Sequence, residues 1–347
     1  MTEEQESASP RRRSYIAAAI GGAAGVAVAA AGVGLVQWYQ AAQVNDAEAA
    51  EEAAEEAAPP DEAVSFEVPA LEAVEAASVE ALLARLREQG NEAWPPDGGE
   101  VVPVTAPSFP DDLDEARVEQ RKEVFFRVLT PLILAENARL REARAFVEEL
   151  AAVPEGERSE ADQARLESLA EHYRVSASGA DFPERLLRRL DEIPVDMALA
   201  QAANESGWGT SRFTREANNL FGEWTWTQEA GIVPERRGEG QTHRIRVFED
   251  LQGAVRGYAY NLNVGHAYEA FRDQRAEMRQ REEPLDGHAL SSGLVAYSER
   301  GEDYVDEVRS MIRFNDLSRY RELELAPVER REVEIALEPG EEVPPEE

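Results

Sequence analysis

A single glutamate at the end of a predicted helix has the surroundings that a catalytic acid needs. Good helix-forming residues run up to Glu205, and the segment 207–209 (Gly-Trp-Gly) then ends the helix. The last helical turn presents unpaired carbonyl oxygens, whose negative partial charge disfavours a carboxylate there. Ala198 and Ala202 share a face with Glu205, so we expect its carboxyl group at the end of an apolar stripe, against Trp208. Burial and the helix end both favour the protonated form, which a general acid requires.

An ordinary structural role is the alternative for Glu205. A helical glutamate of this kind can form an ion pair with a nearby arginine, and Arg212 is close in the sequence. The spacing of the residues alone leaves the two interpretations open. The partners and the ionisation of Glu205 therefore decide between them.

Several separated motifs resemble those of one enzyme family. The run 193–209, which contains Glu205, is followed by four more motifs in the family's order. These are Asn218–Gly222, Gly231–Pro234, Tyr297–Gly301 and Met311–Asn315. The sequence from Phe109 to Tyr320 thus resembles glycoside hydrolase family 73, bacterial N-acetylglucosaminidases that cut peptidoglycan, and within it the Bax-like proteins of Gram-negative bacteria. The resemblance implies a lysozyme-like fold, in which Glu205 matches the proton-donating glutamate.

The resemblance also implies a second catalytic group on a β-hairpin downstream of Glu205. Glu239 is the first candidate, because its flanking glycines permit unusual backbone angles and close approach of a ligand. Glu235 is the next candidate, and Glu223, beside the Phe221–Gly222 turn, is a third. Some family members use the N-acetyl group of the substrate or a tyrosine instead. The sequence therefore leaves retention or inversion of stereochemistry open.

Aromatic residues supply the candidate sugar-binding surface. Tyr297 matches a tyrosine near the family's catalytic site and could hydrogen-bond the N-acetyl group or the attacking water. Otherwise it is a helix-end tyrosine with its hydroxyl in solvent. Flat rings with a polar edge suit sugars, and the candidates are Trp208, Trp224, Trp226 and Tyr260. Phe221 and Tyr258 are expected in the core instead.

The composition excludes several other classes of function. The chain has 347 residues, with 36 Lys and Arg against 70 Asp and Glu, and its formal net charge of −34 argues against nucleic acid as a partner. The absence of cysteine excludes disulfides, thiol nucleophiles and cysteine metal ligands. The histidines show no metal-ligand spacing and no nucleotide-binding motif occurs, so we expect neither a metal site nor a cofactor.

The N-terminus resembles an anchoring or export signal. Arg11–Arg13 precede the uncharged run 15–36, which is long enough to span a bilayer, and acidic residues follow. The positive-inside rule then places residues 1–14 in the cytoplasm and the rest of the chain beyond the inner membrane. The segment 12–16 also resembles a twin-arginine signal, which is cleaved after export. Both interpretations predict a periplasmic catalytic domain.

The remaining pattern predicts a mainly α protein of the lysozyme-like α+β class with a small β-hairpin lobe. Residues 37–110 are rich in acidic residues and proline, and we interpret them as a mostly extended linker. Helical periodicity then begins, and Pro131 could kink or divide that helix. We assign a helical N-terminal part, a catalytic domain and an acidic, disordered tail to residues 111–185, 186–320 and 321–347.

The resemblance and the acid together predict a peptidoglycan hydrolase that cleaves beside N-acetylglucosamine, an endo-β-N-acetylglucosaminidase with Glu205 as proton donor. A lytic transglycosylase is the enzymatic alternative, because it also uses a Glu-Ser-Gly pattern and needs only one carboxyl group. A non-catalytic wall-binding envelope protein is the alternative outside enzymes. The expected partners are peptidoglycan glycan strands and, through the N-terminal segment, the inner membrane.

Overall fold

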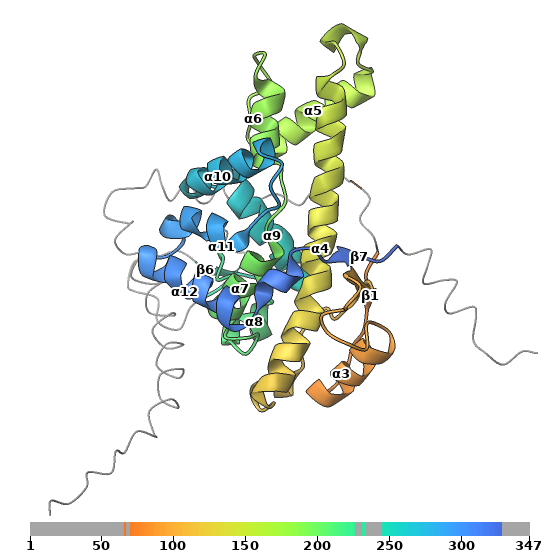
Figure 1. The fold of residues 1–347 in the computed structure, drawn as a ribbon, viewed down its shortest axis with the longest axis vertical. Helices are drawn as coiled ribbons and strands as arrows, with labels where there is room; N and C mark the ends of the chain where they lie inside the picture. The colour runs from red at the N-terminus through yellow and green to blue at the C-terminus, as the bar shows by residue number, and fades with distance from the viewer. Residues whose placement is uncertain (1–65, 67–69, 226–230, 234–243, 328–347) are drawn as a thin grey trace, which may run out of the picture.

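The computed structural model describes residues 66, 70–225, 231–233 and 244–327, and helices dominate this part of the chain (Figure 1). The α-helices are α3 (Val79–Glu88), α4 (Val118–Ala151), α5 (Glu160–His172), α6 (Phe182–Arg189), α7 (Val195–Ser206), α8 (Arg212–Ala217), α9 (Leu251–Val264), α10 (Glu269–Gln280), α11 (Gly287–Leu290) and α12 (Glu302–Phe314). The 3-10 helices are η1 (Asp111–Asp114), η2 (Glu155–Glu157), η4 (His266–Tyr268), η5 (Ser291–Tyr297) and η6 (Leu317–Tyr320). The strands are β1 (Glu72–Ala73), β2 (Glu100–Val101), β3 (Val104–Thr105), β4 (Trp224–Thr225), β5 (Gly231–Ile232), β6 (Arg244–Arg246) and β7 (Glu324–Leu325). The prediction of a mainly helical protein is confirmed.

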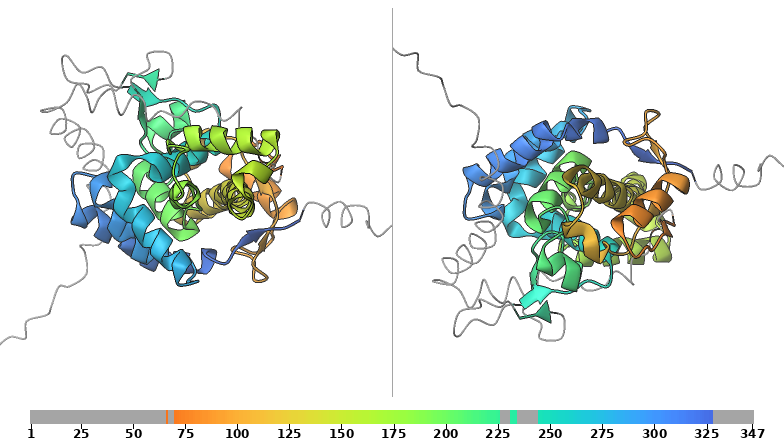
Figure 2. Two further views of the ribbon diagram at one scale, coloured as in Figure 1. Left: turned by 90° about the horizontal axis from the view of Figure 1, so that it is seen from above. Right: turned by 90° about the horizontal axis from the view of Figure 1, so that it is seen from below.

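The long helix α4 forms the central support of the fold. Its apolar residues recur at helical spacing, and every residue from Val124 to Asn137 is buried. Pro131 lies inside α4 and does not divide it. Helices α7 and α9 contact α4, and α3 contacts it as well. Figure 2 looks along α4 and shows the orange N-terminal segment on one side, with the green and blue helices on the other.

The helix that contains Glu205, α7, is enclosed on nearly every side. Pro194 precedes its first turn, a position that suits proline because the first N–H groups of a helix have no helical partner. Helices α4, α11 and α12 and the 3-10 helix η6 all contact α7, so nearly all its residues are buried. Gly207 ends the helix in the left-handed conformation at φ 58°, and Trp208 follows at φ 63°. The predicted helix and its stop are confirmed.

A small antiparallel sheet follows α8 in the chain. Its strand order is β4-β6-β5, and Ile245 of β6 pairs with Trp224 on one side and Ile232 on the other. We expected a two-stranded hairpin, but β6 is paired along both edges in the described residues. Asn219 fixes the entry into this sheet, because its Oδ1 accepts the Glu223 N–H and its Nδ2 donates to the Glu223 carbonyl oxygen.

Residues 70–110 are a folded part of the molecule, so the linker prediction is wrong for this stretch. Helix α3 buries an apolar face that includes Leu82 and Leu86, and it packs on α4. Strand β1 pairs in parallel with β3. The glycines and prolines that suggested a linker lie between packed elements, as at Gly99, whose φ of 76° suits a turn. The short apolar pattern of α3 therefore indicates the structure of this stretch better than its content of glycine and proline.

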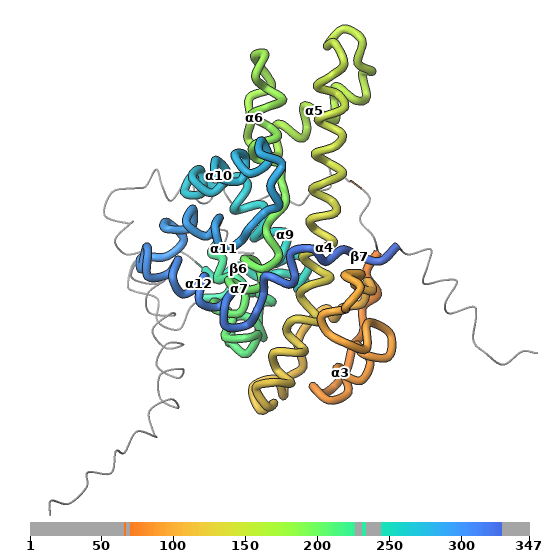
Figure 3. The backbone as a smooth tube through the Cα atoms, in the orientation of Figure 1, coloured from red at the N-terminus to blue at the C-terminus, as the bar shows by residue number. Residues whose placement is uncertain are grey.

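The tail prediction is also wrong where the tail begins. Strand β7 pairs in parallel with β2, and Figure 3 shows the blue C-terminal segment passing across α4 to reach the N-terminal segment. Arg321 fastens this segment to the core: its Nε lies 2.6 Å from Asp196 Oδ2, and its Nη2 lies 2.6 Å from Asp286 Oδ1. Two carboxylates and a strand pairing thus hold the chain beyond residue 320.

The predicted membrane segment 15–36 lies outside the described residues, as do the rest of the linker before residue 66 and the tail from residue 328. Within the ranges that the structure describes, none of the helices has the length and apolar character that crossing a bilayer needs.

Candidate active site

Glu205 lies in the last turn of α7, where α7 meets the beginning of α12. The hydroxyl of Tyr304 donates a hydrogen bond to its carboxyl group. The side chain is half-buried, and burial raises the pKa of Glu205 to about 7. The Tyr304 hydrogen bond and the charge of Arg300 oppose this rise in pKa, whereas the charge of Glu307 adds to it. A carboxyl group that keeps its proton near neutral pH can act as a general acid.

The charges around Glu205 come from α12 and the loop before it. Arg212, the partner that a structural ion pair would need, lies 2.9 Å from Glu216 through its Nε. Arg300 instead acts on Glu205, and it also forms an ion pair with Glu307 and places its guanidinium 5.5 Å from the Tyr304 ring centroid. The interpretation of Glu205 as an ordinary helical glutamate paired with Arg212 is therefore not supported.

A buried amide orients the tyrosine that contacts Glu205. Gln201 lies one helical turn before Glu205, and its Nε2 donates to the Tyr304 hydroxyl at 2.9 Å. Its Oε1 accepts a hydrogen bond from the Tyr258 hydroxyl at 2.6 Å. All of Gln201, Tyr258 and Tyr304 are at most 1% exposed. Because the Tyr304 oxygen accepts from Gln201, its own proton is directed to Glu205.

Stacked aromatic side chains connect the two tyrosines that bond Gln201, so that the contacts form a closed circuit. Phe221 stacks on Tyr258 with centroids 3.9 Å apart, and Tyr297 stacks on Tyr304 at 5.3 Å. The Tyr297 hydroxyl donates to the carbonyl oxygen of Phe221 at 3.0 Å. The expectation that Phe221 and Tyr258 lie in the core is confirmed, since they are 2% and 1% exposed.

The position of Tyr297 differs from both interpretations of the sequence. Its side chain is buried, and its hydroxyl is neither in solvent nor directed at a substrate, because it bonds the backbone of Phe221. Burial raises the pKa of the Tyr297 hydroxyl well above its usual value, and the nearby Glu205 carboxylate adds to the rise. It therefore positions the Glu205 site through Phe221 and Tyr304.

Trp208 packs against α4 instead of against Glu205. Its ring centroid lies 5.4 Å from that of Phe125 and 5.5 Å from that of Phe126, both in edge-on contacts. Lys122 Nζ lies 4.5 Å from the Trp208 centroid, over the ring. The left-handed backbone at this turn directs the ring toward α4. The structure thus places Trp208 in the packing between α7 and α4 and not on a bare sugar-binding surface.

Tyr260 packs against the end of α5 and not against Glu205, and its role as a sugar-binding residue stays a prediction. Its hydroxyl donates to the carbonyl oxygen of His172 at 2.9 Å, and its ring contacts His172 and Tyr173. Only 6% of the residue is exposed. The physical reason is helical geometry, because Tyr260 is two residues beyond Tyr258 on α9 and points about 200° further round the helix.

Glu223 is a second carboxyl group with unusual surroundings. Its Oε2 accepts a hydrogen bond from Arg246 Nη1 at 3.1 Å, and its Oε1 is buried with no hydrogen-bond partner among the described residues. The carboxyl group lies against Gly257 of α9, where an added Cβ would be 3.0 Å from Oε1. Burial raises the pKa of Glu223 to about 7, and the Arg246 charge and hydrogen bond oppose the rise.

The other predicted residues fall mostly outside the described part. Glu239, Glu235 and Trp226 lie outside it, so their roles stay predictions. Trp224 lies in β4, half-buried, opposite Ile245. Within the described ranges, no group of three or more His, Asp or Glu side chains could hold a metal ion.

The sequence interpretation missed the residues that surround Glu205. Gln201 could have been found, because it is a polar residue one turn before the acid on an otherwise apolar helix. Arg300 belongs to the Tyr297–Gly301 motif. Tyr304 and Glu307 have no local signal, because only the packing of α12 against α7 brings them to the site.

Comparison with known proteins agrees with this geometry. Residues 184–317 match the Glucosaminidase family, described as mannosyl-glycoprotein endo-beta-N-acetylglucosaminidase. The chain is also 33% identical to Protein bax of Escherichia coli (strain K12) over 211 residues, which are 60% of this chain and 74% of the E. coli protein. No solved structure matches. The chain belongs to the Bax-like glucosaminidases of glycoside hydrolase family 73, and it is a glycoside hydrolase.

Proposed function

We propose that this protein is a peptidoglycan hydrolase that cuts the glycan strand beside N-acetylglucosamine, as an endo-β-N-acetylglucosaminidase. The single observation that supports this most is the environment of Glu205, whose pKa is raised to about 7 at the end of α7. Membership of the glucosaminidase family supports the class of bond, and the bacterial relative supports a cell-wall substrate.

In this proposal Glu205 protonates the oxygen of the departing sugar. Cleavage of a glycosidic bond builds positive charge on the sugar ring, and protonation of the leaving oxygen lowers the barrier. The Tyr304 hydrogen bond favours the ionised product of that transfer. Tyr304 and Gln201 therefore both orient the acid and stabilise it after it has lost its proton.

The second catalytic group is proposed to come from the region of the small sheet. Glu223 is the described candidate, because one of its oxygens has no protein partner among the described residues. Glu239 and Glu235 remain candidates from the sequence. The distance between Glu205 and the active member of this set sets the stereochemistry, with about 5 Å for retention and about 6.5–9.5 Å for inversion.

A lytic transglycosylase is the second candidate function, because the reaction needs only one carboxyl group and Glu205 alone supplies it. Mass spectrometry of digested muropeptides separates the two reactions. Hydrolysis produces a reducing end on N-acetylglucosamine, and transglycosylation produces an anhydro sugar on the neighbouring residue. Products that carry only anhydro ends would replace the proposed function with the second one.

We also propose that the catalytic part works in the periplasm. The support is the sequence alone: Arg11–Arg13 and the uncharged run 15–36 suit an inner-membrane anchor or an export signal. Fractionation of cells with a C-terminal tag tests the compartment. N-terminal sequencing of the mature protein distinguishes the anchor from the cleaved signal.

A further inference from the structure

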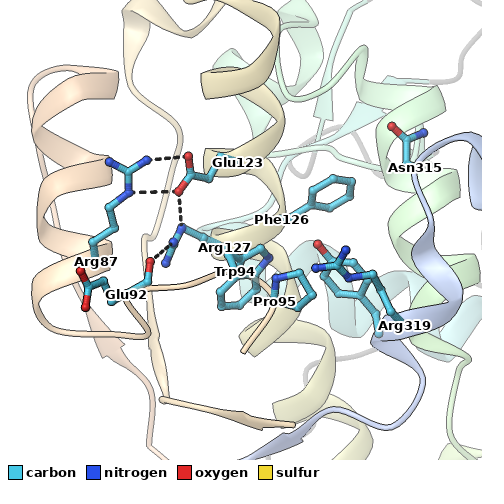
Figure 4. Close-up of a pocket in the computed structure, with 10 residues that line it drawn as sticks. Arg87, Glu92, Trp94, Pro95, Glu123, Phe126, Arg127, Asn315 and Arg319 are labelled. Carbon is cyan, nitrogen blue, oxygen red and sulfur yellow. Dashed lines mark hydrogen bonds and ion pairs between the residues drawn. The ribbon is translucent and has the colours of Figure 1, made fainter. Parts of the chain in front are cut away.

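A pocket of about 590 Å³ lies on the side of α4 that faces the N-terminal segment and the end of α12 (Figure 4). Its lining includes charged and aromatic side chains from α3, the loop after α3, α4 and η6. They include Arg87, Glu92, Trp94, Phe126, Asn315 and Arg319. The pocket exists only because residues 70–110 are folded onto α4.

One wall of the pocket is an ion-pair network of one carboxylate and two guanidinium groups. Glu123 bridges two arginines, with its Oε2 at 2.7 Å from Arg87 Nη2 and its Oε1 at 2.9 Å from Arg127 Nε. Arg127 is buried and lies 5.2 Å from the Trp94 ring centroid. This wall is therefore held in place by its own contacts, and its two guanidinium groups share a single carboxylate, so the wall keeps a net positive charge.

Two further charged side chains at the pocket are exposed, one with a single long ion pair and the other with none among the described residues. The side chain of Arg319 is 50% exposed, and its one ion pair among the described residues is with Asp316 at 3.7 Å. Glu92 is exposed and forms no ion pair with any described residue. Figure 4 shows Arg319 with Asn315 on one side of the pocket, and Glu92 with Arg87 on the other. The pocket thus offers a cation and a carboxylate at separate places.

A lysine connects this pocket to the helix that contains Glu205. Lys122 is the only lysine of the chain. Its Nζ lies 2.7 Å from Oδ1 of Asn315, a pocket residue, and over the ring of Trp208, three residues after Glu205. No carboxylate of the described residues forms an ion pair with it. An ammonium has three N–H groups, so one direction remains for a ligand.

We propose that this pocket, with Lys122 at its edge, binds the peptide that is attached to the glycan strand of peptidoglycan. Such a stem peptide is short and presents free carboxylates, and in many bacteria a free amino group as well. Carboxylates suit Lys122 and Arg319, and an amino group suits Glu92. The glycan itself is largely uncharged and would use none of these groups.

The position of the pocket agrees with such a ligand. Phe126 lines the pocket, and its ring contacts both Trp208 and Tyr320. The pocket is thus separated from the turn after Glu205 by one layer of side chains. In this proposal the glycan strand runs past Glu205, and a peptide on the sugar next to the cleaved bond extends to the pocket. This inference rests on the proposed function.

The test compares two substrates for the full-length protein. Intact peptidoglycan retains its stem peptides, and the same glycan treated with an amidase has lost them. We expect kcat/KM to be at least about tenfold higher on the intact material, the worth of one charge-assisted hydrogen bond. Arg319→Gln and Lys122→Gln should each lower this ratio by about threefold or more, and Lys122→Arg should retain most of it. Arg281→Gln, an exposed change just after the end of α10, should keep the wild-type ratio.

Binding provides a readout that does not depend on turnover. The Glu205→Gln variant of the full chain should bind a free stem tetrapeptide in calorimetry, and adding Arg319→Gln should weaken that binding. A wild-type ratio near one, or a ratio that Arg319→Gln leaves unchanged, overturns the peptide pocket while hydrolysis still supports the proposed function. Failure to cleave either substrate overturns both. Thermal melts confirm that each variant is folded.

Discussion

The Tyr304 hydroxyl donates a hydrogen bond to the Glu205 carboxyl group, which joins the beginning of α12 to the end of α7. Burial alone would raise the pKa of Glu205 further, and this hydrogen bond holds it at about 7. The acid is therefore neither fully protonated nor fully ionised at neutral pH. In the proposed mechanism, that balance lets Glu205 give up a proton to the leaving sugar and recover it in the next cycle.

Replacing Glu205 with glutamine should reduce hydrolysis by at least about a hundredfold, because an amide cannot donate the proton that a general acid supplies. Muropeptide release from purified peptidoglycan, followed by chromatography, measures the loss. Glu302→Gln, an exposed glutamate at the start of α12, is the matched control and should retain activity. Wild-type activity in the Glu205→Gln variant would remove Glu205 from the mechanism.

The pH profile of kcat/KM should fall on its alkaline side with an apparent pKa of about 7, the pKa of Glu205. The sign follows from the role, because only the protonated acid donates, and about a tenth of it is protonated one unit above its pKa. Initial rates between pH 5 and pH 9 measure this limb. An alkaline limb near the pKa of a free glutamate would contradict the assignment.

Tyr304→Phe should move the alkaline limb to higher pH and lower the rate. The lost hydrogen bond stabilises the ionised carboxylate, so the pKa of Glu205 rises when it is removed. The same pH profile measures the shift. Tyr260→Phe is the matched control, because it also removes one buried tyrosine hydroxyl, on α9. It should leave the alkaline limb of the pH profile unchanged. A shift in both variants would point to a general loss of stability.

The stability of the protein should fall as pH rises from about 4.5 to about 7, in part through Glu223. Its pKa in the folded protein is raised from 4.5 to about 7, so the folded state binds the proton more tightly than the unfolded state. The contribution is fully present below pH 4.5 and is lost as pH passes 7, by about 3 kcal/mol. Denaturant unfolding at both ends of this range should show a smaller loss in Glu223→Gln. An equal loss in both proteins would contradict the burial of this carboxyl group.

Gly257→Ala should destabilise the protein by about 1–3 kcal/mol, because the new Cβ meets Phe248 at 2.9 Å and Glu223 at 3.0 Å. Gly253→Ala, on the same helix, is the matched control. Its Cβ would meet nothing closer than 3.5 Å, so the gain in helix propensity should stabilise by about 0.5–1 kcal/mol. Thermal unfolding of the two variants measures both changes in stability, the expected loss and the expected gain. Equal effects would mean that Glu223 does not pack on Gly257.

Local pattern was sufficient to predict most of the helical fold. The apolar spacing of α4, the Pro194 start of α7 and the stop at Gly207 depend on neighbouring residues, so the chain specifies them without knowledge of what lies nearby. Glu205 is predicted as the candidate acid for the same reason, because the helix end and the glycine turn are local. The linker prediction failed where composition was weighed above the short apolar pattern of α3.

The amino-acid sequence by itself determined which side chain is the candidate acid and which helix presents it. Only the tertiary structure decided what surrounds that acid. Tyr304 approaches from about a hundred residues away, Trp208 turns to α4, and Tyr260 points to the opposite side of α9. The physical reason is that periodicity specifies which face of a helix is buried, whereas the packing of distant elements decides what covers that face.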